Sequence, residues 1–179
     1  MRQVDRPHPI VNFVMFQIGW FAAVLGAAYR QVGLGIALVA VILTIHIVLI
    51  RNRQKELTLI LTAGIIGFTI ESALILLQAY KPVQWILPPP MAPLWLVIMW
   101  MNIAITPNGC LRWLRPRPVL AALLGAIGGP VAYYTGERFG ALSFVHSLPW
   151  SLGLIAIVWA VAMPGLFHLG GQQEEQIKP

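Results

Sequence analysis

Charged side chains are scarce in this sequence. Only 10% of its 179 residues are charged, whereas 58% are hydrophobic. A soluble domain carries about 25% charged residues, so the charges here are too few to cover a surface that faces water. Several apolar runs also reach the ~20 residues that a helix needs to cross a bilayer. The composition therefore predicts an integral membrane protein and argues against a soluble globular domain.

Cysteine and closely spaced metal ligands are also lacking. Cys110 is the only cysteine, which excludes an intramolecular disulfide and a cysteine-based metal cluster. The four histidines, His8, His46, His146 and His168, show neither HxxxH nor HxH spacing. No nucleotide-binding, cofactor-binding or catalytic motif is present either. We therefore expect no metal and no cofactor, and the sequence leaves catalysis undecided, with the balance against an enzyme.

The net charge of +6 does not indicate a nucleic-acid partner. The basic residues stand beside the apolar runs in two main groups, Arg51–Lys55 and Arg112–Arg117. Basic residues in such places are topology signals and contacts for lipid headgroups. We therefore expect membrane lipids as partners, and other membrane subunits as a further possibility.

Six apolar runs divide the chain. They predict an all-α, polytopic membrane protein with about six transmembrane helices in one compact bundle, between a disordered tail at 1–9 and a polar tail at 170–179. The proline-rich link 81–93 is expected at the membrane interface, because prolines prevent a regular helix and Trp85 favours that depth. The expected helices cover residues 10–29, 32–50, 57–79, 91–106, 118–135 and 149–169.

The distribution of Lys and Arg predicts the orientation. With the N-terminus inside, the inner segments carry nine of these residues and the outer segments carry three. This asymmetry follows the positive-inside rule, so both termini are expected in the cytoplasm.

Glu71 is the most informative single residue, because it lies near the middle of the apolar run 57–79. A carboxylate at that depth is costly and needs a partner, a proton or a function. At 100° per residue, Glu71 and Gln78 share one helix face with Gly64 and Gly67. Two interpretations remain open: Glu71 forms the protonated floor of an outward-facing pocket, or it makes a buried hydrogen bond to a neighbouring helix.

The partner of Glu71 is also open. Arg30 or Arg138 can reach it from the outer side, and His46 can meet it across the midplane. Trp95 and Asn102 are seven residues apart and share a face of the fourth run. The candidate ligand-binding residues are therefore Glu71, Gln78, Trp95, Asn102 and His46.

A second candidate site lies in the basic and aromatic connector RWLRPRP. Arg112, Trp113 and Arg115 have the composition of a contact for anionic lipid headgroups. The alternative is that these residues determine topology and bind no ligand.

Four segments carry a family resemblance: NFVMFQIGWFAAVLGA (12–27), APLWLVIMW (92–100), LRWLRPRP (111–118) and GAIGGPVAYYTGERFGA (125–141). In this order they resemble an uncharacterised bacterial family of small inner-membrane proteins, classed as a domain of unknown function. The resemblance covers nearly the whole chain and implies a six-span protein of the cytoplasmic membrane with a role in lipid modification or stress response. It carries over no catalytic residue, and the segment ITPNGC departs from the pattern.

Three functions fit these observations. The first is the binding or transport of an apolar or amphiphilic, lipid-like ligand. The second is an accessory or assembly role in a larger membrane complex. The third is a membrane-embedded lipid-modifying enzyme with Glu71 as acid or base, helped by His46 or Asn102.

Overall fold

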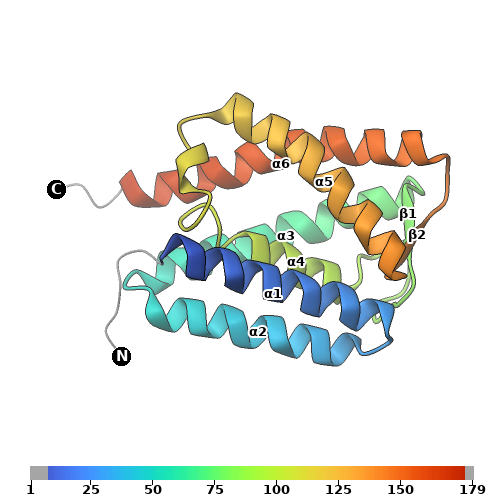
Figure 1. Ribbon diagram of the computed structural model, residues 1–179, viewed down its shortest axis with the longest axis horizontal. Coiled ribbons are helices and arrows are strands. Elements are labelled where there is room, and N and C mark those ends of the chain that lie inside the picture. The colour runs from blue at the N-terminus through green and yellow to red at the C-terminus, as the bar shows by residue number, and fades with distance from the viewer. Residues whose placement is uncertain (1–7, 176–179) are drawn as a thin grey trace.

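The computed structural model describes residues 8–175, with side chains as far as residue 172. In this part of the chain six α-helices form one bundle, and two short strands pair at one end (Figure 1). The helices are α1 (Pro9–Ala28), α2 (Val32–Leu49), α3 (Arg53–Leu76), α4 (Leu94–Ile103), α5 (Pro118–Phe139) and α6 (Leu148–Glu175). A 3-10 turn, η1 (Arg112–Leu114), and the strands β1 (Tyr80–Pro82) and β2 (Leu142–Phe144) complete the fold.

Five of the helices are long and apolar enough to cross a membrane. The exception is α4, whose ten residues rise only about 15 Å. It begins after Pro93, packs against α1, α2 and α3, and buries Trp95, Leu96, Trp100 and Asn102. The prediction of an all-α, multi-pass membrane protein is confirmed, with one helix shorter than expected.

Several boundaries differ from the sequence prediction. The third helix ends at Leu76 rather than at residue 79, and Gln78 has a φ of 56° in the turn that follows. The fifth helix continues to Phe139, and α6 extends through part of the predicted C-terminal tail to Glu175. Most of the predicted N-terminal tail, 1–7, and the last residues, 176–179, lie outside the described residues.

The two strands were not predicted from the sequence. They pair antiparallel, with Tyr80 opposite Phe144 and Pro82 opposite Leu142. The pairing joins the segment after α3 to the segment after α5. It therefore fixes the position of Tyr80, which is buried.

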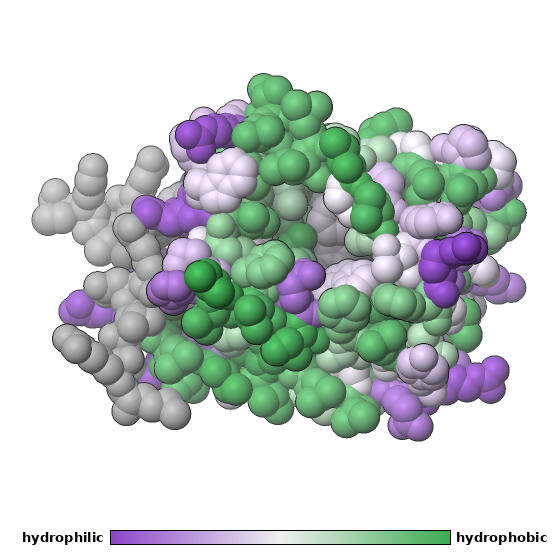
Figure 2. All heavy atoms as spheres, in the orientation of Figure 1, coloured by the Kyte–Doolittle hydropathy of each residue, from purple (hydrophilic) through white to green (hydrophobic). Residues whose placement is uncertain are grey.

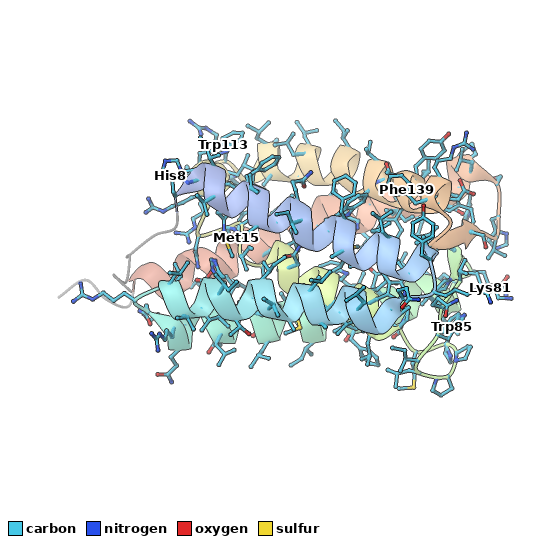
Figure 3. All side chains as sticks on the ribbon, turned by 60° about the horizontal axis from the view of Figure 1, so that its bottom comes forward. His8, Met15, Lys81, Trp85, Trp113 and Phe139 are labelled. Atoms are coloured by element: carbon cyan, nitrogen blue, oxygen red, sulfur yellow. The ribbon has the colours of Figure 1, made fainter. Side chains whose placement is uncertain are left out.

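The two ends of the bundle differ in charge. Both described chain ends lie at one end, together with η1 and the α2–α3 turn, and the strands lie at the other (Figure 1). Figure 3 shows His8 and Trp113 near the first end and Lys81 and Trp85 near the second. The two main basic groups therefore share one end, which we call the basic end.

The face of the molecule shown in Figure 2 is mostly hydrophobic between these ends. Large hydrophobic side chains are exposed on the long helices, among them Ile65, Val119, Ile157 and Val161 at 67–73%. Such a surface suits contact with lipid chains and not with water.

Glycines allow the helices to approach closely inside the bundle. A Cβ on Gly67 would lie 2.1 Å from Cγ of Trp100, and one on Gly129 would lie 2.4 Å from Cγ of Trp159. The two indoles stack on each other, with ring centroids 4.7 Å apart. The glycine spacing at 125 and 129 thus serves packing between α5 and α6.

Candidate functional sites

Glu71 lies inside a cage of hydrogen-bond donors. Its Oε1 accepts from the indole nitrogen of Trp100 at 2.6 Å and from the hydroxyl of Tyr133. Its Oε2 accepts from the hydroxyl of Tyr80. The carboxylate is fully buried. This cluster, Glu71 with Tyr80, Trp100 and Tyr133, is called the aromatic cage below.

Four elements contribute to the aromatic cage. Glu71 stands on the buried face of α3, Trp100 on α4 and Tyr133 on α5, and the strand pair brings Tyr80 from β1. Burial, and next the charge of Glu71, raise the pKa of the Tyr80 phenol well above its usual range. Tyr80 therefore keeps its proton at neutral pH and remains a donor.

Of the two interpretations of Glu71, the structure agrees with the buried hydrogen bond. Both carboxylate oxygens already have partners, and Glu71 lines neither the groove between α1 and α2 nor the one between α5 and α6. Neither Arg30 nor Arg138 is among its partners; Arg138 instead lies over the ring of Tyr134, 5.7 Å from its centroid. An indole N–H can only donate, so Trp100 requires an acceptor at this position.

A second buried cluster lies at the basic end. His46 Nε2 is 2.8 Å from Glu56 Oε1, and Asn108 Nδ2 donates to Glu56 Oε2 over 2.7 Å. His46 and Glu56 are both buried. The cluster joins α2, the first turn of α3 and the loop after α4. Glu56 is thus a second buried carboxylate, directly after the basic group Arg51–Lys55 in the sequence.

The two clusters are well separated. Glu56 and Glu71 are fifteen residues apart on α3, about 22 Å along its axis. His46 therefore does not meet Glu71 across the midplane.

The remaining candidate ligand-binding residues occupy other places. Gln78 is exposed in the turn after α3, so it no longer shares a helix face with Glu71. Trp95 and Asn102 are buried, and Asn102 donates to the carbonyl of Phe16 on α1 at 2.9 Å. The structure brings Glu71 together with none of the other four.

A groove follows the contact between α1 and α2 and has a volume of about 670 Å³. Gly26 and Gly35 let the two helices touch, since a Cβ on Gly26 would lie 3.0 Å from Gly35 Cα. The lining is mostly apolar, and Tyr29 and Gln31 lie at the end away from the basic end. This surface is called the α1–α2 groove below.

Gln17 is a polar lining residue of the α1–α2 groove and stands near the middle of α1. It lies about 12 Å from the start of α1 and is half-buried in the groove wall. Its amide makes no hydrogen bond to any described residue. The sequence shows Gln17 as a polar interruption of an apolar run, but not which side of the helix it occupies.

At the basic end, η1 presents an exposed tryptophan beside an arginine. Trp113 is 48% exposed, and the guanidinium of Arg117 lies 5.8 Å from the centroid of its ring. Arg117 also donates to the carbonyl of Trp113 at 2.8 Å. Arg115 is half-buried and donates to the carbonyl of Gly170 on α6 at 3.1 Å. Of the predicted headgroup residues, Trp113 is the one that is openly exposed.

Sequence reasoning missed several of these residues. Tyr80 and Tyr133 belong to segments far from Glu71 in the chain, and no local pattern connects them. Across residues 8–175, no group of three or more His, Cys, Asp and Glu side chains is arranged to hold a metal ion.

Comparison with known proteins places these features in one family. Residues 9–165 match the family described as "Protein of unknown function (DUF2878)". No curated protein and no solved structure matches the chain.

Proposed function

The chain belongs to this DUF2878 family, and we propose that it binds an amphiphilic, lipid-like molecule in the α1–α2 groove. The single observation that carries the proposal is the amide of Gln17, which has no hydrogen-bond partner among the described residues and lies in a mostly apolar groove wall within a spanning helix. A polar group at that depth is costly unless a partner satisfies it.

The shape and lining of the groove support the same proposal. Its volume of about 670 Å³ lies in the range of small-molecule sites, which are mostly apolar with a few placed polar groups. Tyr29 and Gln31 offer polar contacts where the groove reaches the membrane interface. In this proposal an amphiphile lies with its chain along the apolar lining and with an oxygen that accepts a hydrogen bond from the amide nitrogen of Gln17.

We place the protein in a bacterial cytoplasmic membrane with the basic end inside. This orientation is supported by Arg51, Arg53, Lys55, Arg112, Arg115 and Arg117, which all belong to the basic end, whereas Arg30, Lys81 and Arg138 lie on segments of the opposite end. A reporter enzyme that works only in the cytoplasm should be active when it is fused after residue 179. A reporter that works only outside the cytoplasm should be inactive at the same position.

The test compares lipids that co-purify with the protein and with two groove variants. Gln17→Leu removes the amide, and Ala22→Leu fills the groove with a larger side chain. Wild-type protein should be enriched in at least one lipid-like species relative to the bulk membrane, and both variants should lose it. Thr69→Val, on the lipid-facing side of α3, is the matched control and should retain the species.

Two results would count against ligand binding. One is a wild-type protein whose lipids mirror the bulk membrane, and the other is equal retention by all variants. The same Gln17 amide also favours a second candidate, an assembly subunit in which a helix of a partner protein covers the groove. In that case a protein, and not a lipid, should co-purify with the wild type and be released by Gln17→Leu.

A further inference from the structure

We propose that Trp113 and Arg117 bind the phosphate of an anionic phospholipid at the basic end of the bundle. This site is separate from the α1–α2 groove, since η1 and the start of α5 form it. The argument rests on the geometry of the two side chains, on the charge around them and on the apolar surface that continues from them along α5.

The side chains of Trp113 and Arg117 are held in place, and both keep N–H donors that bond to no described residue. Arg117 is fixed by its contact with the Trp113 ring and by one hydrogen bond to the Trp113 carbonyl. A guanidinium has five N–H donors, and those of Arg117 that remain have no partner among the described residues. The indole nitrogen of Trp113 likewise has no protein partner there. Two kinds of donor thus stand side by side at an exposed position.

The surrounding charge favours an anion. Arg112 and Arg115 lie within five residues of Arg117 and add positive charge. Glu56 belongs to the same end, but it is buried and already bonded to His46 and Asn108. Arg117 is the exposed cation beside Trp113, so a phosphate that approaches η1 is attracted by its guanidinium.

The exposed apolar residues on α5 favour a phospholipid over a soluble phosphate as the ligand, because they can contact acyl chains. Val119, Leu123, Ile127 and Val131 are 73%, 56%, 63% and 58% exposed, and they recur every four residues directly after Arg117. A spacing of four residues turns by about 40° per step, so these residues form a slowly winding apolar stripe on α5 that begins two residues after Arg117. The acyl chains of a lipid bound at η1 can lie along this stripe.

A second pair of an arginine and an aromatic ring, at the other end of α5, can serve as the control for this site. Arg138 lies over the ring of Tyr134 at the other end of α5, with nearly the same cation–π geometry. Glu137 is its neighbour in sequence, so the local charge there is lower than at η1. A generic effect of an arginine on an aromatic ring would act equally at both ends.

Native mass spectrometry of the full-length protein can test the proposal, with phosphatidylglycerol and phosphatidylcholine of identical chains. Wild-type protein should bind phosphatidylglycerol about fivefold more tightly, and Arg117→Gln should remove most of this preference. Arg117→Lys should keep part of it, because the charge remains, and Trp113→Leu should reduce it. Arg138→Gln should leave it unchanged.

Equal affinity of the wild-type protein for both lipids would overturn the proposal. An unchanged preference in Arg117→Gln, or an equal loss in Arg138→Gln, would also overturn it. Inorganic phosphate at millimolar concentration should not displace the bound lipid. If it does, the site recognises phosphate alone and the acyl-chain stripe has no part in it.

Discussion

Trp100 donates its indole hydrogen to Glu71 over 2.6 Å, and the ring of the same residue fills the space that Gly67 leaves open. The acid that is costly in the membrane thus accepts a hydrogen bond from a buried indole that can only donate. Together with the two tyrosines, this pair joins α3, α4, α5 and β1. The aromatic cage is therefore a polar connection inside an apolar bundle, and its energy depends on all four partners.

Glu71→Gln should destabilise the bundle. The amide nitrogen of glutamine cannot accept a hydrogen bond, so at least one of the three donors in the cage loses its acceptor. We expect a loss of about 1–3 kcal/mol in the free energy of unfolding, measured by thermal unfolding in a mild detergent. Thr69→Val, two residues away on the lipid-facing side, should change stability by less than about 0.5 kcal/mol. Equal stability of the two variants would show that the cage contributes nothing.

The stability of the protein should fall at alkaline pH in a way that depends on Tyr80. Burial and the Glu71 carboxylate raise the pKa of this phenol, so the folded protein keeps a proton that the unfolded chain loses near pH 10. This contribution is complete below about pH 10 and is lost as the pH rises further. Tyr80→Phe should therefore reduce the decline in stability above pH 10. Tyr29→Phe, at an exposed position, should leave the decline as it is in the wild type.

Glu56→Ala should be more disruptive than its position in a charged segment indicates. It leaves the buried His46 and the half-buried Asn108 without their shared acceptor, and the loss of such hydrogen bonds costs about 1–3 kcal/mol. Arg53→Ala changes an exposed residue in the same helical turn and should cost less than about 1 kcal/mol. Chemical unfolding in mixed micelles can compare the two. Similar values for both would mean that Glu56 is solvated in the membrane-bound protein.

Two adjacent glycines in α5 should respond in opposite ways to alanine. Gly129→Ala places a methyl group against the Trp159 ring and should cost about 1–3 kcal/mol. Gly128→Ala points into open space and should be neutral or stabilising by up to about 1 kcal/mol, because alanine favours a helix. Thermal unfolding of the two variants side by side measures the difference. Loss of stability in both would point to helix distortion instead of contact with Trp159.

The membrane class and the apolar segments could be predicted because hydropathy is a local property. Each run of about 20 apolar residues must span the bilayer as a helix whatever its neighbours do. The fourth helix was the exception: its prolines and turns shorten it to ten residues, and neighbouring helices bury it. The end of the third helix was not predicted, because the chain leaves the helix through a left-handed backbone conformation at Gln78. Hydropathy and composition do not indicate such a turn.

The candidate site was predicted only in part. Glu71 is recognisable because a lone acid in an apolar run is unusual, and the sequence correctly left a buried hydrogen bond as one of its two outcomes. Its donors come from positions 9, 29 and 62 residues further along the chain. Such contacts depend on how α4, α5 and the strand pair pack, which periodicity within one segment does not report.

The sequence by itself determined that this chain is a multi-pass membrane protein with one acid deep in a span, because charge and hydropathy are read residue by residue. Only the tertiary structure decided that Glu71 is enclosed by two tyrosines and a tryptophan, that Glu56 is buried with His46, and that Gln17 faces a groove. The physical reason is the same in each case. A polar side chain in a membrane must find its partner across helices, and the partner is chosen by packing rather than by distance along the chain.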